Sequence, residues 1–146
     1  MTDKDEIARA SAEAMWADDA ACKAFGMRVM EVRSGYARMD MVIAPHMTNG
    51  HGTCHGGYIF SLADSAFAYA CNSYGQRAVA QHCTITYVSP GRLGSRITAE
   101  AHVRLQQDRS GIYDVTVRDE EGAVIAEFRG HSRTLPARLI EAPQAH

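Results

Sequence analysis

The sequence predicts an α+β fold in which a curved antiparallel sheet of about six strands wraps around one long central helix, with a further helix at the N-terminus. Apolar residues recur at three- and four-residue spacing from Tyr58 to Cys71, which is the period of a helix. Segments that alternate between apolar and polar residues follow one another with short turns between them, as in an antiparallel sheet. Because the helix is apolar on nearly all sides, the sheet or a second subunit must cover it.

Length, charge and cysteine usage limit the class of protein. A chain of 146 residues is expected to form one domain, 1–146, with a core of its own. A net charge of −2 gives no reason to expect a nucleic acid or an anionic membrane surface as partner. The acidic start does not resemble a signal peptide, and no apolar run is long enough to span a bilayer. The four cysteines lack paired spacing, which indicates reduced thiols and a cytoplasmic protein.

The predicted elements follow in chain order. An Ala-rich N-terminal helix is expected at about 3–24, with Gly26 just after its end. The central helix is expected at about 55–73, and the tail is expected to be frayed from about 136. The strands are expected at 27–33, 36–43, 78–88, 96–106, 112–118 and 123–134.

Three details of the strands can be read from the pattern. Ser34-Gly35 is expected to form a tight hairpin turn between the first two strands. Gly130 is expected to mark a bulge or a close approach of the backbone to another group. Alternation in the strand at 96–106 predicts inward-facing positions at Ile97, Ala99, Ala101, Val103 and Leu105.

Asp64 is the only charged residue between Asp40 and Arg77, and it lies in the middle of the apolar helix. A carboxylate is costly to bury unless another group interacts with it. Asp64 is therefore either a structural residue that hydrogen-bonds a neighbour or reaches solvent, or a catalytic carboxylate.

The start of the same helix favours the catalytic interpretation. Gly56 and Gly57 lie where backbone N–H groups lack partners within the helix and the helix dipole is positive. Such a terminus can stabilise a carbonyl oxygen that becomes an oxyanion. Asp64 lies eight residues after Gly56, roughly 12 Å along the helix, so it cannot reach a carbonyl bound at its own Gly56. A site that uses both groups therefore requires two copies of the helix, and we expect a dimer with shared active sites.

The motifs are also recognisable. The sequence Asn49-Gly50-His51, followed by His55-Gly56-Gly57 and by Ser61-Leu62-Ala63-Asp64, resembles the hotdog-fold acyl-CoA thioesterases, and more narrowly their PaaI subfamily of phenylacetate degradation. Two further stretches, Val88-Ser89-Pro90-Gly91 and Phe128-Arg129-Gly130, match as well, so that the resemblance covers nearly the whole chain.

The resemblance implies a hotdog fold, a dimer with a continuous sheet that pairs again into a tetramer, and an acyl-CoA substrate with an aryl-acetyl group. It implies that the Gly56 N–H polarises the thioester carbonyl and that Asp64 of the neighbouring subunit activates water or attacks directly. Asn49 would place the water, and His55 would set the geometry of carboxylate and carbonyl. Some relatives carry a helpful serine where this chain has Ala80.

Other interpretations remain open at this point. Gly57 and Tyr58 are candidates for substrate contact, although Tyr58 is equally suited to core packing. His51, Cys54 and His55 are of types that bind metals, but no second paired motif accompanies them. We therefore expect no metal and no cofactor besides the coenzyme A of the substrate. A hydratase or dehydratase acting on acyl thioesters, and a non-catalytic acyl-CoA binding protein, are the alternative functions.

Overall fold

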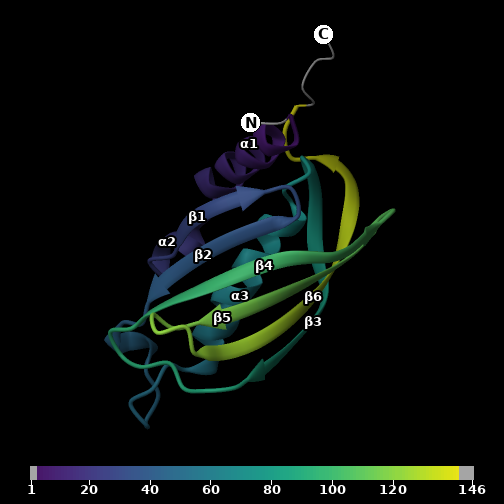
Figure 1. The fold of residues 1–146 in the computed structure, drawn as a ribbon. Helices are drawn as coiled ribbons and strands as arrows, with labels where there is room; N and C mark the ends of the chain where they lie inside the picture. Colours follow the sequence, from purple (N-terminus) through teal and green to yellow (C-terminus); the bar gives the residue numbers. More distant parts are fainter. Residues whose placement is uncertain (1–2, 142–146) are drawn as a thin grey trace.

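A computed structural model describes residues 3–141 of the chain (Figure 1). The expected antiparallel sheet and the two expected helical regions are present, together with one short 3-10 helix. The elements are α1 (Asp3–Ala17), α2 (Ala20–Ala24), β1 (Arg28–Arg33), β2 (Tyr36–Val42), η1 (Pro45–Met47), α3 (Gly56–Cys71), β3 (Gln76–Tyr87), β4 (Arg96–Gln107), β5 (Ser110–Arg118) and β6 (Val124–Arg138).

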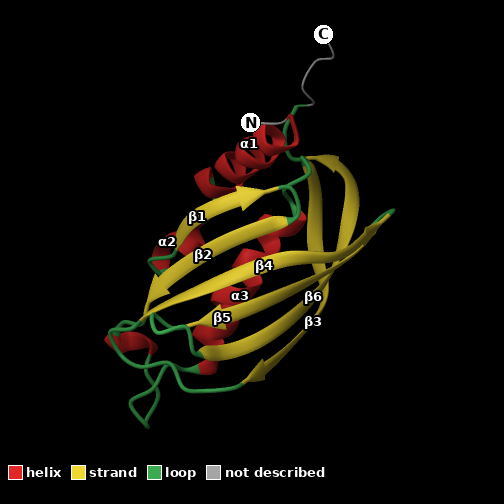
Figure 2. Ribbon diagram, in the orientation of Figure 1, coloured by secondary structure: helices red, strands yellow, loops and turns green. Residues whose placement is uncertain are grey.

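The strands form one sheet in the order β1-β2-β4-β5-β6-β3, and every neighbouring pair is antiparallel. The sheet curves around α3, while α1 lies beside β1 (Figure 2). The predicted hotdog fold is confirmed. The sheet order leaves β1 and β3 as its edge strands, and β3 carries the residues that follow the central helix. Among residues 3–141, no helix has the length and hydropathy needed to cross a membrane.

The core lies between α3 and the concave face of the sheet. Met39 and Met41 of β2 and Val115 and Val117 of β5 are fully buried there, as period-two alternation requires. Gly130 of β6 faces the aromatic ring of Phe67 from α3. A Cβ atom at this position would lie 2.7 Å from that ring, so the close approach expected at Gly130 is confirmed.

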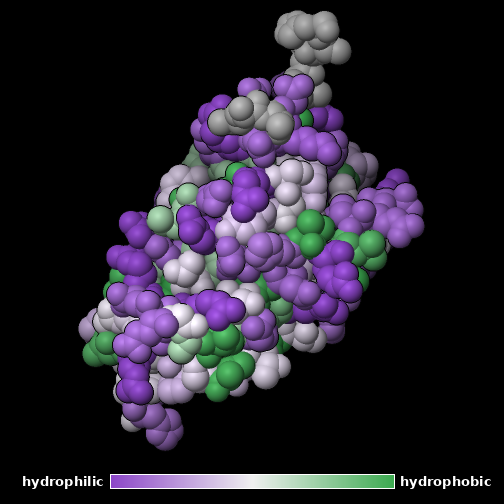
Figure 3. All heavy atoms as spheres, in the orientation of Figure 1, coloured by the Kyte–Doolittle hydropathy of each residue, from purple (hydrophilic) through white to green (hydrophobic). Residues whose placement is uncertain are grey.

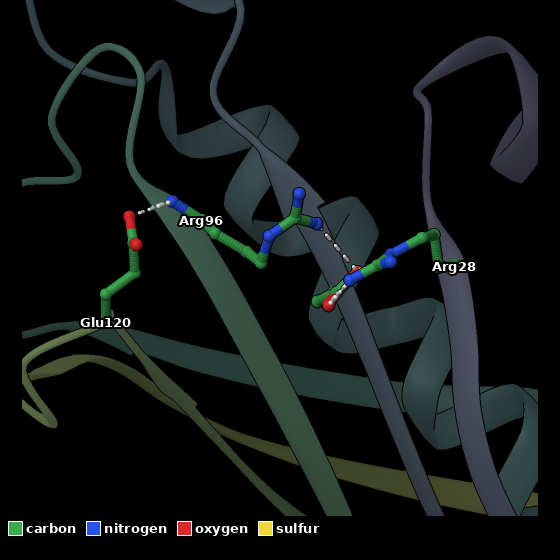
Figure 4. A network of polar contacts seen from close by, with 4 residues as sticks. Arg28, Arg96 and Glu120 are labelled. Carbon is green, nitrogen blue, oxygen red and sulfur yellow. Dashed lines mark hydrogen bonds and ion pairs between the residues drawn. The ribbon is translucent and has the colours of Figure 1, made fainter.

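The outer face of the sheet is polar. Figure 3 shows this face covered mainly by hydrophilic residues, with small separate apolar groups between them. Asp40 of β2 points outward yet is only 4% exposed, because two arginines cover it. Arg28 donates to both carboxylate oxygens at 2.9 and 2.7 Å, and Arg96 donates to one of them at 3.3 Å (Figure 4). The backbone N–H of Arg96 donates to Glu120. This network connects β1, β2 and β4.

The Ala-rich pattern predicts one continuous helix over 3–24, and this prediction is wrong. The segment is divided into α1 and α2. The break occurs at Asp18 and Asp19. The Asp19 side chain accepts a hydrogen bond from the Cys22 N–H at 3.1 Å and so caps a new helix. An aspartate favours this capping position over the interior of a helix.

The central helix is slightly shorter than 55–73. His55 has extended backbone angles and is the N-cap, and Asn72 is the C-cap. The inward positions predicted for Val103 and Leu105 are wrong: these side chains are 39% and 48% exposed. The pairing register of β4 with β5 shifts between them, and the β4–β5 hairpin projects beyond the rest of the sheet (Figure 2).

The chain was expected to be frayed from about 136, but regular structure continues beyond this point. Strand β6 continues to Arg138, which pairs with Gln76 of β3. The Leu139 N–H then donates to the Gly75 carbonyl at 2.9 Å. Backbone pairing with β3 therefore extends the order past Pro136. The rest of the expected frayed segment, 142–146, lies outside the described residues.

Candidate active site

The start of α3 presents one free backbone donor. The His55 side chain caps the helix, since its Nδ1 accepts a hydrogen bond from the Gly57 N–H at 2.9 Å. The Tyr58 N–H donates to the His55 carbonyl at 3.0 Å. Within residues 3–141, the Gly56 N–H has no hydrogen-bond partner. Of the two glycine donors expected at this terminus, the Gly57 N–H is therefore engaged and the Gly56 N–H is available at the positive end of the helix dipole.

Gly56 is held by the end of the edge strand β3. The Tyr87 hydroxyl donates to the Gly56 carbonyl at 3.0 Å, and a Cβ atom at position 56 would lie 2.9 Å from the Tyr87 ring. A cavity of about 480 Å³ opens here, lined by Cys54, Gly56, Ile59, Tyr87 and residues 88–90. Glycine is required at this position because the tyrosine ring occupies the space of a side chain.

Asn49 organises the loop that leads to this helix start. Its Oδ1 accepts hydrogen bonds from the His51 N–H at 2.9 Å and from the N–H and hydroxyl of Thr53, both at 3.3 Å. Its amide NH₂ group has no partner among the described residues. Asn49 thus supports the loop with its oxygen and keeps two donors available for a water molecule.

Tyr58 packs into the protein beside the helix start. Its ring centroid lies 5.1 Å from that of Phe25, 6.0 Å from that of His46 and 6.4 Å from that of His55. These contacts favour the packing interpretation over direct contact with a substrate. None of the described residues forms a cluster of three or more His, Cys, Asp or Glu side chains that could hold a metal ion.

Asp64 is partly buried and faces β3. Its side chain interacts with Cys83, whose Sγ lies 3.9 Å from Oδ1. Burial raises the pKa of Asp64, and the Cys83 hydrogen bond opposes this effect. No Lys, Arg or His among the described residues forms an ion pair with it. Within residues 3–141, Asp64 therefore has a thiol as its hydrogen-bond partner and no cation.

Cys83 was not found from the sequence as a neighbour of Asp64. It belongs to β3, where a register shift against β6 lies between Ala80 and His82. Burial and the nearby Asp64 charge raise the pKa of the Cys83 thiol. The thiol therefore stays protonated at neutral pH and can donate to the carboxylate. Ala80 lines the cavity beside Asp64, but its side chain has no hydrogen-bonding group.

The two candidate groups meet the same edge strand at different points, since Asp64 contacts Cys83 within β3 and Gly56 contacts its last residue. Asp64 borders a cavity of about 440 Å³ that reaches residues 77–80 at the start of β3. Gly56 contacts Tyr87 at the end of β3. The helix separates Gly56 and Asp64 by roughly 12 Å, so the two groups of one chain cannot act on the same carbonyl. Such an arrangement of a helix terminus and a carboxylate suits the hydrolysis of an activated carbonyl.

Comparison with known proteins also indicates a hydrolase that acts on an activated carbonyl. The family model described as the Thioesterase superfamily matches residues 51–126. The acyl-coenzyme A thioesterase PaaI of Escherichia coli K12 is 45% identical over 125 residues, which is 86% of this chain and 89% of that protein. This chain belongs to the thioesterase superfamily.

Solved structures of thioesterase relatives share the fold. The E. coli PaaI protein from the phenylacetic acid degradation operon superposes with a TM-score of 0.90 at 42% identity, covering 92% of this chain and 97% of that one. A mutant of the phenylacetic acid degradation protein PaaI from Thermus thermophilus gives 0.75 at 36% identity, covering 78% and 97%. The matched superfamily region contains Gly56, Asp64 and Cys83, whereas α1 and most of β6 lie outside it.

Proposed function

We propose that this protein is an acyl-CoA thioesterase that hydrolyses aryl-acetyl-CoA thioesters, such as phenylacetyl-CoA or hydroxyphenylacetyl-CoA, to the free acid and coenzyme A. The name and the operon of the similar E. coli protein support the substrate class and a role in phenylacetate degradation. The observation that carries the proposal is the pair of unsatisfied groups on α3: the Gly56 N–H without a partner and the Asp64 carboxylate without a cation among the described residues.

The reaction follows from these two groups. The thioester carbonyl oxygen accepts a hydrogen bond from the Gly56 N–H, where the helix dipole stabilises the charge that develops on it. Asp64 takes a proton from the water that attacks the carbonyl carbon, or attacks that carbon itself. The carbon–sulfur bond then breaks and coenzyme A leaves as its thiolate. When Asp64 acts as the base, the thiolate takes up the proton that Asp64 accepted from water. When Asp64 attacks directly, the acyl group is left as a mixed anhydride with Asp64, and water then hydrolyses this anhydride, which gives the free acid, regenerates the carboxylate and supplies the proton for the thiolate. Both roles require Asp64 in its ionised form.

A homodimer would complete the site. If the edge strands β3 of two chains pair antiparallel about a two-fold axis, the start of one strand lies beside the end of the other. If the axis passes between Cys83 and Tyr87, Asp64 of one chain, which contacts Cys83, approaches the partner's Gly56, which contacts Tyr87. We further propose that two such dimers form a tetramer. A cytoplasmic location remains a prediction.

The other residues of the loop have supporting roles in this proposal. The Asn49 amide group binds the attacking water, while its oxygen keeps the loop in shape. His55 holds the helix start so that the Gly56 N–H points outward, and Gly57 allows the substrate to approach. Because the His55 Nδ1 already accepts from the Gly57 N–H, this histidine is poorly suited to act as the base of a hydratase.

The test is the release of coenzyme A from acetyl-, hexanoyl-, phenylacetyl- and hydroxyphenylacetyl-CoA. The wild-type protein should act fastest on the aryl-acetyl substrates, and Asp64→Asn should lower kcat by about 10²- to 10⁴-fold because the base or nucleophile is lost. Asp108→Asn is the matched control. Asp108 is exposed in a turn at φ 53°, a conformation that asparagine also adopts.

Full activity of the Asp64→Asn protein would refute the role of this carboxylate. If the wild-type protein released no coenzyme A from any of the four substrates but bound them tightly, it would be an acyl-CoA binding protein rather than a thioesterase.

A further inference from the structure

The cavity beside Asp64 has a largely apolar wall. Its volume is about 440 Å³, within the range of small-molecule sites, which is about 300–1,000 Å³. Three alanines, Ala68 of α3 and Ala78 and Ala80 of β3, line it and leave its interior open. Phe67 of α3 also borders the cavity. Larger residues at the alanine positions would fill this space.

The polar residues of the wall are few. The side chain of Asn72 is fully engaged: its Oδ1 accepts from the Ala78 N–H at 2.9 Å, and its Nδ2 donates to the carbonyls of Ala68 and Ala78 at 2.9 and 3.1 Å. Arg77 is the one basic residue that lines the cavity within the described part of the chain. The phosphates of coenzyme A would require several basic groups, so the wall suits an apolar group better than the nucleotide.

Three residues of the cavity wall come from segments near the two ends of the chain. Met15 comes from α1, Leu135 from β6, and Leu139 from the segment after β6. The Leu139 backbone is fixed by its hydrogen bond to Gly75. All three residues lie outside the region 51–126 that matches the superfamily model. The shared thioesterase region therefore supplies Asp64, and segments outside it close the cavity.

Building on the proposed function, we infer that this cavity binds the acyl group of the thioester, with the carbonyl at the Asp64 end, and that Met15, Leu135 and Leu139 limit the size of the group. A ring-sized apolar acyl group fills the space between the alanines and these three side chains. A flexible methionine can adapt to such a ring and make sulfur–aromatic contacts with it. An acetyl group leaves most of the cavity empty, so it gains little binding energy there.

The experiment measures binding rather than turnover, in the Asp64→Asn background. Calorimetry gives the Kd of phenylacetyl-CoA and of coenzyme A for this protein, and the ratio of the two isolates the contribution of the acyl group. We expect phenylacetyl-CoA to bind about tenfold or more tightly than coenzyme A. Adding Ala68→Leu should bring this ratio close to one and leave the Kd of coenzyme A unchanged, because the leucine occupies the acyl space.

A second variant and a control complete the design. Leu139→Trp narrows the cavity at a partly exposed position, so it tests the inference even if Ala68→Leu does not fold. It should also lower the ratio. Ala21→Leu makes the same change as Ala68→Leu on the exposed surface of α2 and should leave the ratio as it was.

The inference is overturned if phenylacetyl-CoA binds no more tightly than coenzyme A, or if the folded cavity variants keep the parental ratio. A failure of the proposed function is seen separately, as the absence of coenzyme A release by the wild-type protein. The binding ratio does not depend on that activity.

Discussion

At the start of α3, Gly56 is enclosed by a histidine cap, a tyrosine hydroxyl and a tyrosine ring, whereas Asp64 on the same helix has one thiol contact and faces an apolar cavity. The first region fixes the direction of a backbone donor. The surroundings of Asp64 leave its carboxylate partly desolvated and without a cation among the described residues. The difference fits the proposed roles, because an oxyanion donor requires rigid geometry, while a general base or nucleophile requires an environment that tunes its pKa.

The largest effect in the rigid region is expected from Gly56→Ala. The added methyl group would lie 2.9 Å from the Tyr87 ring, so the helix start or the strand must move. We expect kcat to fall about 100-fold, because the oxyanion donor is displaced, and the free energy of unfolding to fall by about 1–3 kcal/mol. Gly50→Ala is the control, since a Cβ atom at Gly50 meets no atom within 4 Å. If the Gly56→Ala protein kept the kcat and KM of the wild-type protein, the start of α3 would not be rigid.

A smaller effect is expected from His55→Ala, which removes the cap of α3. The Gly57 N–H then loses its acceptor, at a cost of about 1 kcal/mol in the free energy of unfolding. The Gly56 N–H becomes less well oriented, so kcat should fall about tenfold with little change in KM. Denaturant unfolding and steady-state kinetics measure the two effects. His51→Ala, an exposed residue of the same loop, should change neither.

The smallest effect is expected in the Asp64 region, from Cys83→Ala. Burial raises the pKa of Asp64 and the Cys83 hydrogen bond lowers it, so loss of the thiol should raise that pKa further. Because the ionised carboxylate is the active form, the acidic limb of the kcat/KM profile should move to higher pH. Cys83→Ser keeps a donor and should leave the limb near its wild-type position. Identical profiles for Cys83→Ala and the wild-type protein would show that the thiol does not tune Asp64.

The raised pKa also predicts the pH dependence of stability. A carboxyl group with a higher pKa in the folded than in the unfolded state binds its proton more tightly in the folded state. The unfavourable contribution of Asp64 is therefore absent below the pKa of the unfolded state, grows as pH rises toward the raised pKa of the folded state, and is complete above it. Asp64→Asn removes it, so this variant should gain stability relative to the wild-type protein above that pKa. Denaturant unfolding across the pH range gives the difference.

The sequence was sufficient for those features that depend on local pattern. The period of the central helix, the alternation of the strands and the lone charge at Asp64 led to the fold and to the candidate carboxylate. The break between α1 and α2 was missed, because capping by Asp19 interrupts an otherwise helical composition. Val103 and Leu105 were placed inward because alternation does not reveal where a strand leaves the core.

Features that depend on contacts distant in sequence could not be predicted. The approach of Cys83 to Asp64 depends on the position of β3 relative to α3, and a bulge within β3 disturbs its alternation. The wall of the Asp64 cavity includes Met15 and Leu139, which lie near opposite ends of the chain. The capping role of His55 requires the backbone angles of the loop.

The central claim is that each active site combines Gly56 of one subunit with Asp64 of the other, and mixing two inactive variants tests it directly. Gly56→Ala and Asp64→Asn proteins are unfolded together, refolded as a mixture and assayed with phenylacetyl-CoA. Half of the dimers should be mixed, and each mixed dimer has one site with neither substitution, so the mixture should recover about a quarter of the wild-type activity. If the activity of the mixture is no greater than the mean of the two variants, the groups do not act across subunits and the claim is contradicted.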